Sequence, residues 1–164
     1  MAGTDEDIAQ AVEAARNAEI AVVTVGDIAG MFGGGTSGEG CDVANLDLPG
    51  RQGELLDAVL DTGTPTVVVL VTGRPYAVGA YADRCAAMIQ AFMPGVEGAG
   101  AIARVLSGEV NPSGHLPVAL PNTPGGQPRL YMTDGLYCLR FYTVISGNYQ
   151  HRYIRYVPQP LPAR

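Results

Sequence analysis

Lysine is absent from this chain of 164 residues, and all ten of its basic residues are arginine. The 16 acidic residues bring the formal net charge to −6 at pH 7, which argues against nucleic acid as the main partner. No apolar run reaches the roughly 20 residues that a membrane-spanning helix needs, so we expect no membrane partner. The basic and apolar pattern of a secretory signal is also missing from residues 1–18, which favours a cytoplasmic location.

Cysteine is scarce as well, and its spacing excludes two kinds of site. Cys41, Cys85 and Cys138 form neither a metal-ligand spacing nor an even set for disulfides, so we expect reduced thiols and no metal. The glycine run at 33–35 is not followed by the Gly-Lys-Ser/Thr of a phosphate-binding loop, and no dinucleotide fingerprint is present. The sequence therefore predicts no cofactor.

Strand-like and helix-like segments alternate along the first 120 residues. β-Branched runs at 20–25 and 65–71 are typical of strands buried on both faces of a parallel sheet. This alternation predicts an α/β fold with a partial, doubly wound, mainly parallel sheet and helices on both faces. The expected strands are 20–25, 65–71, 86–92 and 116–120. The expected helices are 5–17, 49–62, 77–83 and 96–106, and we expect Asp5 or Asp7 to cap the first of them.

The last part of the chain has a different composition. Residues 1–128 hold five arginines against fifteen acidic residues, whereas 129–164 hold five arginines against Asp134 alone. Aromatic runs at 136–145 and 149–157 are joined through Ser-Gly-Asn, which predicts a β-hairpin. We therefore divide the chain into a domain at 1–128 and a tail at 129–164. Tyrosine and arginine favour an interface role for this tail, and stacking on bases is the alternative.

The most informative motif lies on the loop that follows the first expected strand. Residues 37–42 read Ser-Gly-Glu-Gly-Cys-Asp, and residues 46–52 read Leu-Asp-Leu-Pro-Gly-Arg-Gln. Glycine on both sides of Glu39 lets the backbone adopt positive φ and leaves room for a ligand to approach. An acid displayed in this way suits proton transfer better than packing.

This stretch resembles the Ser-Glu-Gly-(Phe/Tyr)-Asp and Leu-Pro-Gly-X-Gln segment of family 3 glycoside hydrolases. The resemblance implies the C-terminal α/β sandwich domain of a β-glucosidase-like enzyme, with Glu39 as its general acid/base. It also implies that the nucleophilic aspartate belongs to an N-terminal (β/α)8 barrel of about 250 residues, so we expect this chain to be an incomplete glycosidase. Three later segments agree with the family in order and spacing, at 72–75, 93–98 and 111–118.

Two aspartates near this motif are candidates for substrate binding. Asp27 ends the first expected strand, at the carboxyl edge where open α/β sheets bind ligands. A cap or a loop-stabilising contact is the alternative role for Asp27. For Asp42 the alternative is to anchor the Glu39 loop by accepting backbone or arginine hydrogen bonds.

Ser37 offers a different chemistry, ester hydrolysis. Residues 35–40 nearly match a nucleophile elbow, except that Glu39 occupies the place of the required glycine. Ser37 and Asp83 with either His115 or His151 would supply the three groups of a hydrolytic triad. A turn serine and a packed surface histidine are the competing interpretations.

These observations leave three functions open. The first is a hydrolase domain that acts on β-linked glucosides, the second is a small esterase that uses an exposed serine, and the third is a non-catalytic, oligomeric sugar-binding or scaffold module. The small-molecule partner is accordingly a carbohydrate or an ester. By the resemblance, the opening strands of the sheet would lie before residue 1, which leaves a sheet edge and apolar faces uncovered. We therefore expect a homo-oligomer, most simply a two-fold dimer, or a barrel domain that is missing here.

Overall fold

The computed structural model describes residues 3–118 and 120–124. Over these ranges the elements follow in the order α1 (Asp5–Arg16), β1 (Ala21–Gly26), α2 (Gln52–Leu60), β2 (Thr66–Val71), α3 (Gly79–Ala82), β3 (Ala87–Gln90) and α4 (Gly98–Leu106). The strand and helix alternation therefore agrees with the sequence prediction. The tail at 129–164, with its expected hairpin, lies outside the described residues.

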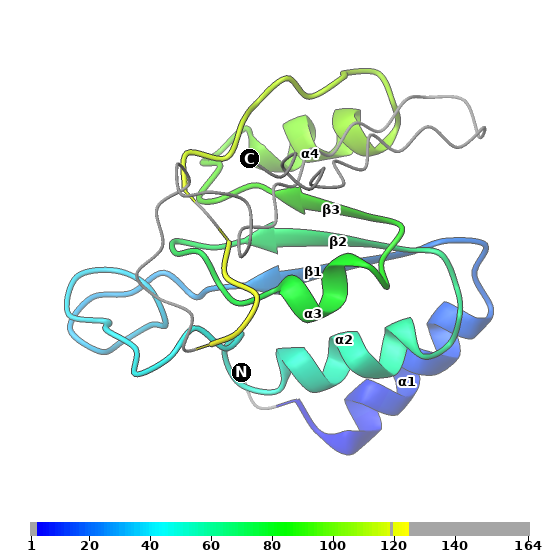
Figure 1. Ribbon diagram of the computed structural model, residues 1–164, viewed down its shortest axis with the longest axis horizontal. Helices are drawn as coiled ribbons and strands as arrows, with labels where there is room; N and C mark the ends of the chain where they lie inside the picture. Colours follow the sequence, from blue (N-terminus) through cyan, green and yellow to red (C-terminus); the bar gives the residue numbers. More distant parts are fainter. Residues whose placement is uncertain (1–2, 119, 125–164) are drawn as a thin grey trace, which may run out of the picture.

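The three strands form one parallel sheet in the order β1-β2-β3 (Figure 1). Ala21 lies opposite Thr66, and Val67 lies opposite Ala87. The central strand β2 has a run of five buried residues, as its β-branched sequence predicted for a strand covered on both faces. The predicted α/β class with a parallel sheet is confirmed.

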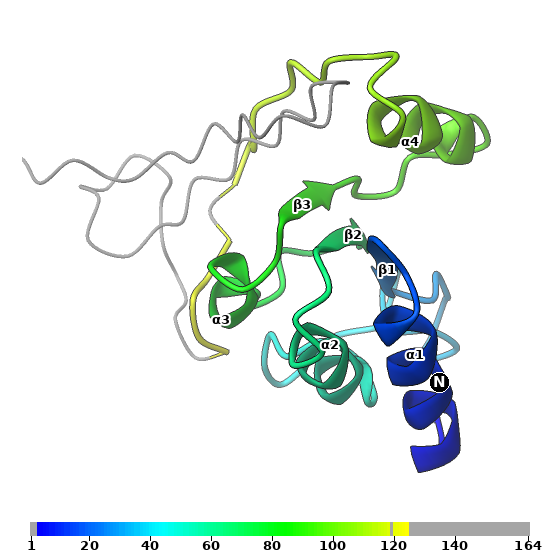
Figure 2. The ribbon, with the colours of Figure 1, turned by 90° about the vertical axis from the view of Figure 1, so that its right-hand side faces the viewer.

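Helices lie on both faces of the sheet (Figure 2). Helices α1, α2 and α3 cover one face, and α4 lies on the other. The main core is between the sheet and the first group of helices, where Leu56 of α2 and Val68 of β2 are fully buried. The other buried members of this core are Val25, Leu48, Leu60, Leu70, Tyr76, Val78, Met88 and Leu120.

Helix α1 begins at Asp5, as expected, but its N-cap is a different residue from those predicted. Thr4 is the N-cap: its hydroxyl accepts a hydrogen bond from the Asp7 backbone N–H at 3.1 Å. The Asp7 carboxylate in turn accepts from the Thr4 N–H at 2.7 Å, which completes a capping box. The prediction that Asp5 or Asp7 caps this helix is wrong, because Thr4 has the extended conformation that an N-cap needs.

The expected fourth strand at 116–120 is not among the strands of the described sheet, and residue 119 lies outside the described residues. Residues 116–118 are not in a strand, whereas Leu120 forms a single β-bridge and is buried in the main core. Pro117 lies within this stretch and Pro121 follows it, and proline cannot donate a hydrogen bond to a strand ladder. The apolar pattern of this stretch therefore reflects packing of Leu120 in the core.

Among the described residues, no helix is long and apolar enough to cross a membrane.

Candidate functional site

The loop between β1 and α2 folds back on itself before it reaches Glu39. The Gly30 N–H donates to the Ser37 carbonyl oxygen at 2.9 Å, and the Thr36 N–H donates to the Ile28 carbonyl oxygen at 2.8 Å. An isolated parallel bridge pairs Ala29 with Ser37. These contacts make residues 28–37 a compact support at the carboxyl end of the sheet (Figure 1).

Glu39 is exposed, and both neighbouring glycines have a steric reason to be glycine. Gly38 has a φ of 135°, and a Cβ at this position would lie 1.8 Å from the Gly30 carbonyl oxygen. Gly40 has a φ of 67°, in the left-handed region. The Glu39 backbone is fixed by a 2.7 Å hydrogen bond from the Phe32 N–H, while among the described residues its carboxylate makes no hydrogen bond or ion pair.

Asp27 is engaged in the protein rather than open to a ligand. Its Oδ1 accepts hydrogen bonds from the Thr36 hydroxyl at 2.7 Å and from the Tyr76 hydroxyl. Its Oδ2 accepts from the Gly73 N–H at 2.8 Å. Because these donors come from both the Glu39 loop and the β2–α3 segment, the carboxylate joins the two, which is the loop-stabilising alternative of the sequence analysis.

The Tyr76 hydroxyl that binds Asp27 stays protonated. Tyr76 is 1% exposed, and burial is the largest cause that raises its pKa well above the usual range. The hydrogen bond to Asp27 raises the pKa further, since it stabilises the neutral phenol as a donor. The hydroxyl is therefore protonated near neutral pH and can donate to Asp27 there.

Arg74 anchors the Glu39 loop. Its Nη2 donates to the Thr36 carbonyl oxygen at 2.9 Å and to the Cys41 carbonyl oxygen at 2.6 Å. Asp42 was the residue predicted for this task, yet its exposed carboxylate makes no hydrogen bond or ion pair with the described residues. The prediction of an anchoring Asp42 is wrong because the loop is tied through the carbonyl oxygens of residues 36 and 41, which need a donor such as arginine.

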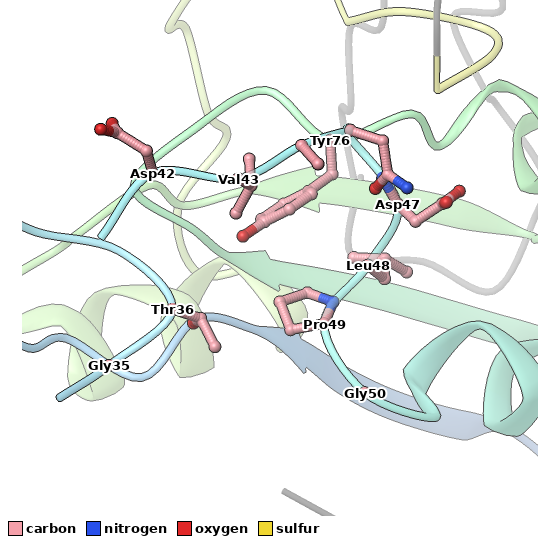
Figure 3. A pocket seen from close by; sticks show the side chains of 11 residues that line it. Gly35, Thr36, Asp42, Val43, Asp47, Leu48, Pro49, Gly50 and Tyr76 are labelled. Atoms are coloured by element: carbon pink, nitrogen blue, oxygen red, sulfur yellow. The ribbon is translucent and has the colours of Figure 1, made fainter. Parts of the chain in front are cut away.

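A cleft of about 390 Å³ lies beside the loop. Figure 3 shows the buried Tyr76 ring between Asp42 at one end of the view and Asp47 at the other, with Pro49 below. Asp42 thus lines the cleft, as a candidate for substrate binding should, whereas Asp27 and Glu39 are not among its lining residues. The remaining lining residues are Gly35, Thr36, Val43, Ala44, Asn45, Leu48 and Gly50.

Ser37 and Asp83 of the alternative esterase site lie at opposite ends of the sheet. Ser37 is 9% exposed and packs against Gly73, which follows β2 at the carboxyl end of the sheet. Asp83 caps α3 and precedes β3, so it lies at the amino end of the sheet. The length of β2 separates these ends, roughly 17 to 20 Å for a six-residue strand. His115 lies in the segment after α4, and His151 lies outside the described residues.

Sequence reasoning missed the roles of Arg74 and Tyr76. Arg74 had been noted only as part of the segment 72–75, and Tyr76 follows that segment. The available signal was an arginine and a tyrosine directly after a buried strand, at the same edge as the Glu39 loop. The described residues hold no group of three or more His, Cys, Asp or Glu side chains that would suit a metal ion.

Residues 1–153 match the family described as the glycosyl hydrolase family 3 C-terminal domain. Over 124 residues the chain is 38% identical to a periplasmic beta-glucosidase of Salmonella typhimurium, an alignment that covers 76% of this chain and 16% of that protein. Over 127 residues it is 36% identical to a beta-xylosidase of Formosa agariphila, and this alignment covers 77% of this chain and 17% of that protein. The chain thus spans about a sixth of the length of these relatives.

Solved structures show the same likeness. A beta-glucosidase from Streptomyces venezuelae, crystallised with D-glucose, superposes with a TM-score of 0.65 at 39% identity, over 73% of this chain and 14% of that one. A beta-glucosidase from Listeria innocua superposes with a TM-score of 0.64 at 31% identity, over 74% and 16%. These identities indicate relatedness as well as a shared fold.

Proposed function

We propose that this chain, which belongs to the glycosyl hydrolase family 3 C-terminal domain family, supplies Glu39 as the general acid/base of a β-glucosidase-type site. The observation that carries the proposal is that Glu39 combines a fixed backbone with an exposed carboxylate. Its backbone is hydrogen-bonded on a folded loop, and its exposed carboxylate is not used by any described residue. The group is thus held in place and left available for a ligand.

In the proposed reaction Glu39 first gives a proton to the oxygen that leaves the sugar. A second carboxylate, about 5 to 5.5 Å away, attacks the anomeric carbon and forms a glycosyl intermediate. Glu39 then takes a proton from the water that releases this intermediate. We assign the second carboxylate to a residue beyond those described here, such as one on a barrel domain.

We propose β-linked glucosides, or closely related sugars, as the substrate class. Relatives that match three quarters of the chain are named as a beta-glucosidase and a beta-xylosidase. The polar side chains of the cleft beside the loop suit such ligands, because Asp42, Asn45 and Asp47 offer hydrogen-bond acceptors and donors for sugar hydroxyls. Asp42 is thereby the better of the two predicted substrate-binding aspartates.

The sharpest test replaces the matching segment of the Salmonella typhimurium enzyme with this chain and varies the leaving group. Methyl β-glucoside needs a proton on its leaving oxygen, whereas dinitrophenyl β-glucoside does not. Glu39→Gln should therefore lower the rate on the methyl glucoside by roughly 10² to 10⁴ and the rate of bond cleavage in the dinitrophenyl glucoside far less.

Glu97→Gln is the matched control, since Glu97 is also exposed but lies at the start of α4. It should leave both rates unchanged. Equal effects of Glu39→Gln and Glu97→Gln on an active chimera would refute the acid/base role. Nitrophenyl acetate hydrolysis by the chain alone, abolished by Ser37→Ala, would favour the esterase alternative instead.

We also propose that the isolated chain associates with a second copy. β1 is an edge strand, and Val22 on it is 50% exposed on the face that it shares with Val67. The tail at 129–164 is the other element that we assign to this interface. Light scattering at low micromolar concentration should give twice the mass of one chain, and deletion of the tail should yield aggregate or a poorly folded monomer. A folded monomer in the full-length sample would refute the association.

A further inference from the structure

A single nitrogen atom holds both ends of the segment that carries Glu39. Arg74 Nη2 donates to the carbonyl oxygens of Thr36 and Cys41, at 2.9 and 2.6 Å. The six residues 36–41 would span roughly 20 Å if extended. Because both ends meet at one guanidinium, the segment is closed into a small loop with Glu39 between its two ties.

A second contact ties the same segment to the sheet. The Thr36 hydroxyl donates to Asp27 Oδ1 at 2.7 Å, and Asp27 Oδ2 accepts from the Gly73 N–H at 2.8 Å. The Tyr76 hydroxyl completes the set as a donor to Oδ1. Asp27 directly follows β1, while Gly73 and Tyr76 follow β2, so this contact joins the loop to the ends of two neighbouring strands.

We propose that Arg74 and Asp27, with Tyr76, are positioning residues that fix the loop of the acid/base Glu39. We call these three side chains the loop clamp. The inference rests on the proposed function, because it assigns the clamp a part in catalysis as well as in folding. Among the described residues, none of the three side chains makes a hydrogen bond or ion pair with the Glu39 carboxylate. Arg74 acts through the carbonyl oxygens of residues 36 and 41, Asp27 through the Thr36 hydroxyl, and Tyr76 through Asp27.

The clamp has a specific consequence for catalysis. A general acid must stay within hydrogen-bond reach of the leaving oxygen, and a displacement of about 1 Å costs up to 10²-fold in rate. Charged hydrogen bonds are stronger than neutral ones, so a guanidinium holds two carbonyl oxygens better than a neutral donor does. Loss of the clamp should therefore lower kcat more than it raises KM.

The loop itself can be tested in the isolated chain by amide hydrogen exchange. The amides of Gly30, Phe32, Thr36 and Cys41 report on it, because each donates a hydrogen bond within the loop. Arg74→Ala should speed their exchange about tenfold or more, the effect of losing one charged hydrogen bond. The β2 amides at 66–71 should keep their protection. Arg104→Ala, at an exposed arginine of α4, should change neither set.

Chemical rescue separates a positioning role from a general loss of stability. Millimolar guanidinium chloride should restore loop protection in Arg74→Ala, since the free cation fits the space and the two carbonyl oxygens. Tyr76→Phe removes one donor to Asp27 but keeps the buried ring, so it serves where Arg74→Ala does not fold. Tyr81→Phe, at a half-buried tyrosine beside the same core, is its matched control.

The outcomes distinguish the clamp from the proposed function. Faster loop exchange, with a kcat loss in the chimera that guanidinium reverses, supports the inference. Unchanged loop exchange in both Arg74→Ala and Tyr76→Phe overturns it, and so does an equal rise across loop and β2 amides. If the loop amides exchange faster in the clamp variants but Glu39→Gln leaves the rate of the chimera unchanged, the acid/base role of Glu39 is refuted, and with it the catalytic role of the clamp.

Discussion

The side-chain amide of Gln52 pairs with both backbone groups of Gly26. Gln52 Nε2 donates to the Gly26 carbonyl oxygen at 2.8 Å, and its Oε1 accepts from the Gly26 N–H at 2.6 Å. Gln52 begins α2, and Gly26 ends β1. The amide thus supplies the two hydrogen bonds that a neighbouring strand would make to the last residue of the edge strand β1. These bonds also fix the start of α2 beside the Glu39 loop.

Gln52→Ala should destabilise the protein by about 1 to 3 kcal/mol, because it leaves a donor and an acceptor of Gly26 without partners in a partly buried place. Gln52→Glu should cost more, since a carboxylate would face the Gly26 carbonyl oxygen. Urea unfolding measures both. Gln10→Ala, on the exposed side of α1, is the control and should lie within about 0.5 kcal/mol of the parent. A Gln52→Ala midpoint equal to the parent's would contradict this role.

The parts of the fold that the sequence predicted depend on local pattern. The run at 65–71 became β2 because β-branched residues without polar interruption suit a strand buried on both faces. Glu39 was singled out as a candidate because its glycine neighbours are a local signal for an unusual backbone, and Gly38 and Gly40 do have positive φ.

The parts that were missed depend on contacts between distant residues. Asp27, Thr36 and Arg74 are brought together only by the parallel pairing of β1 with β2. The wrong anchoring role for Asp42 and the wrong strand at 116–120 share this cause. In both cases the local sequence pattern suited the predicted role, but the contact that decides the role is made by residues distant in the sequence.

Gly38→Ala should disrupt the Glu39 loop, since its Cβ would lie 1.8 Å from the Gly30 carbonyl oxygen at a φ of 135°. We expect a loss of at least about 2 kcal/mol in the free energy of unfolding, or a rearranged loop with faster amide exchange at 30–41. Gly100→Ala is the contrast, because this helical glycine has open space around its Cβ position. It should stabilise the protein by about 0.5 to 1 kcal/mol, and opposite signs for the two variants are the decisive result.

Asp7 should make α1 sensitive to acid. Its hydrogen bond with the Thr4 backbone, followed by that with the Thr4 hydroxyl, holds the pKa of Asp7 below 3.8. A carboxyl group whose pKa is lowered by folding stabilises the protein above its usual pKa and loses this effect as the pH falls. The melting temperature of Asp7→Asn should therefore fall less than that of the parent between about pH 5 and pH 2. Asp42→Asn, at an exposed aspartate whose carboxylate makes no hydrogen bond with the described residues, should follow the parent curve.

Cys85 should react slowly with alkylating reagents in the folded chain. Burial raises its pKa from 9.0 to about 11, and a shift of this size lowers the reactive thiolate fraction about 100-fold near pH 8. The neutral thiol is favoured by folding, so the associated stability is present below pH 9 and is lost as the pH rises through about 11. Iodoacetamide labelling is read out on the tryptic peptide 85–104, because the chain has arginine but no lysine. The labelling rate should rise about 100-fold in urea, and equal rates in the folded and unfolded chain would show that Cys85 is accessible and ionises normally.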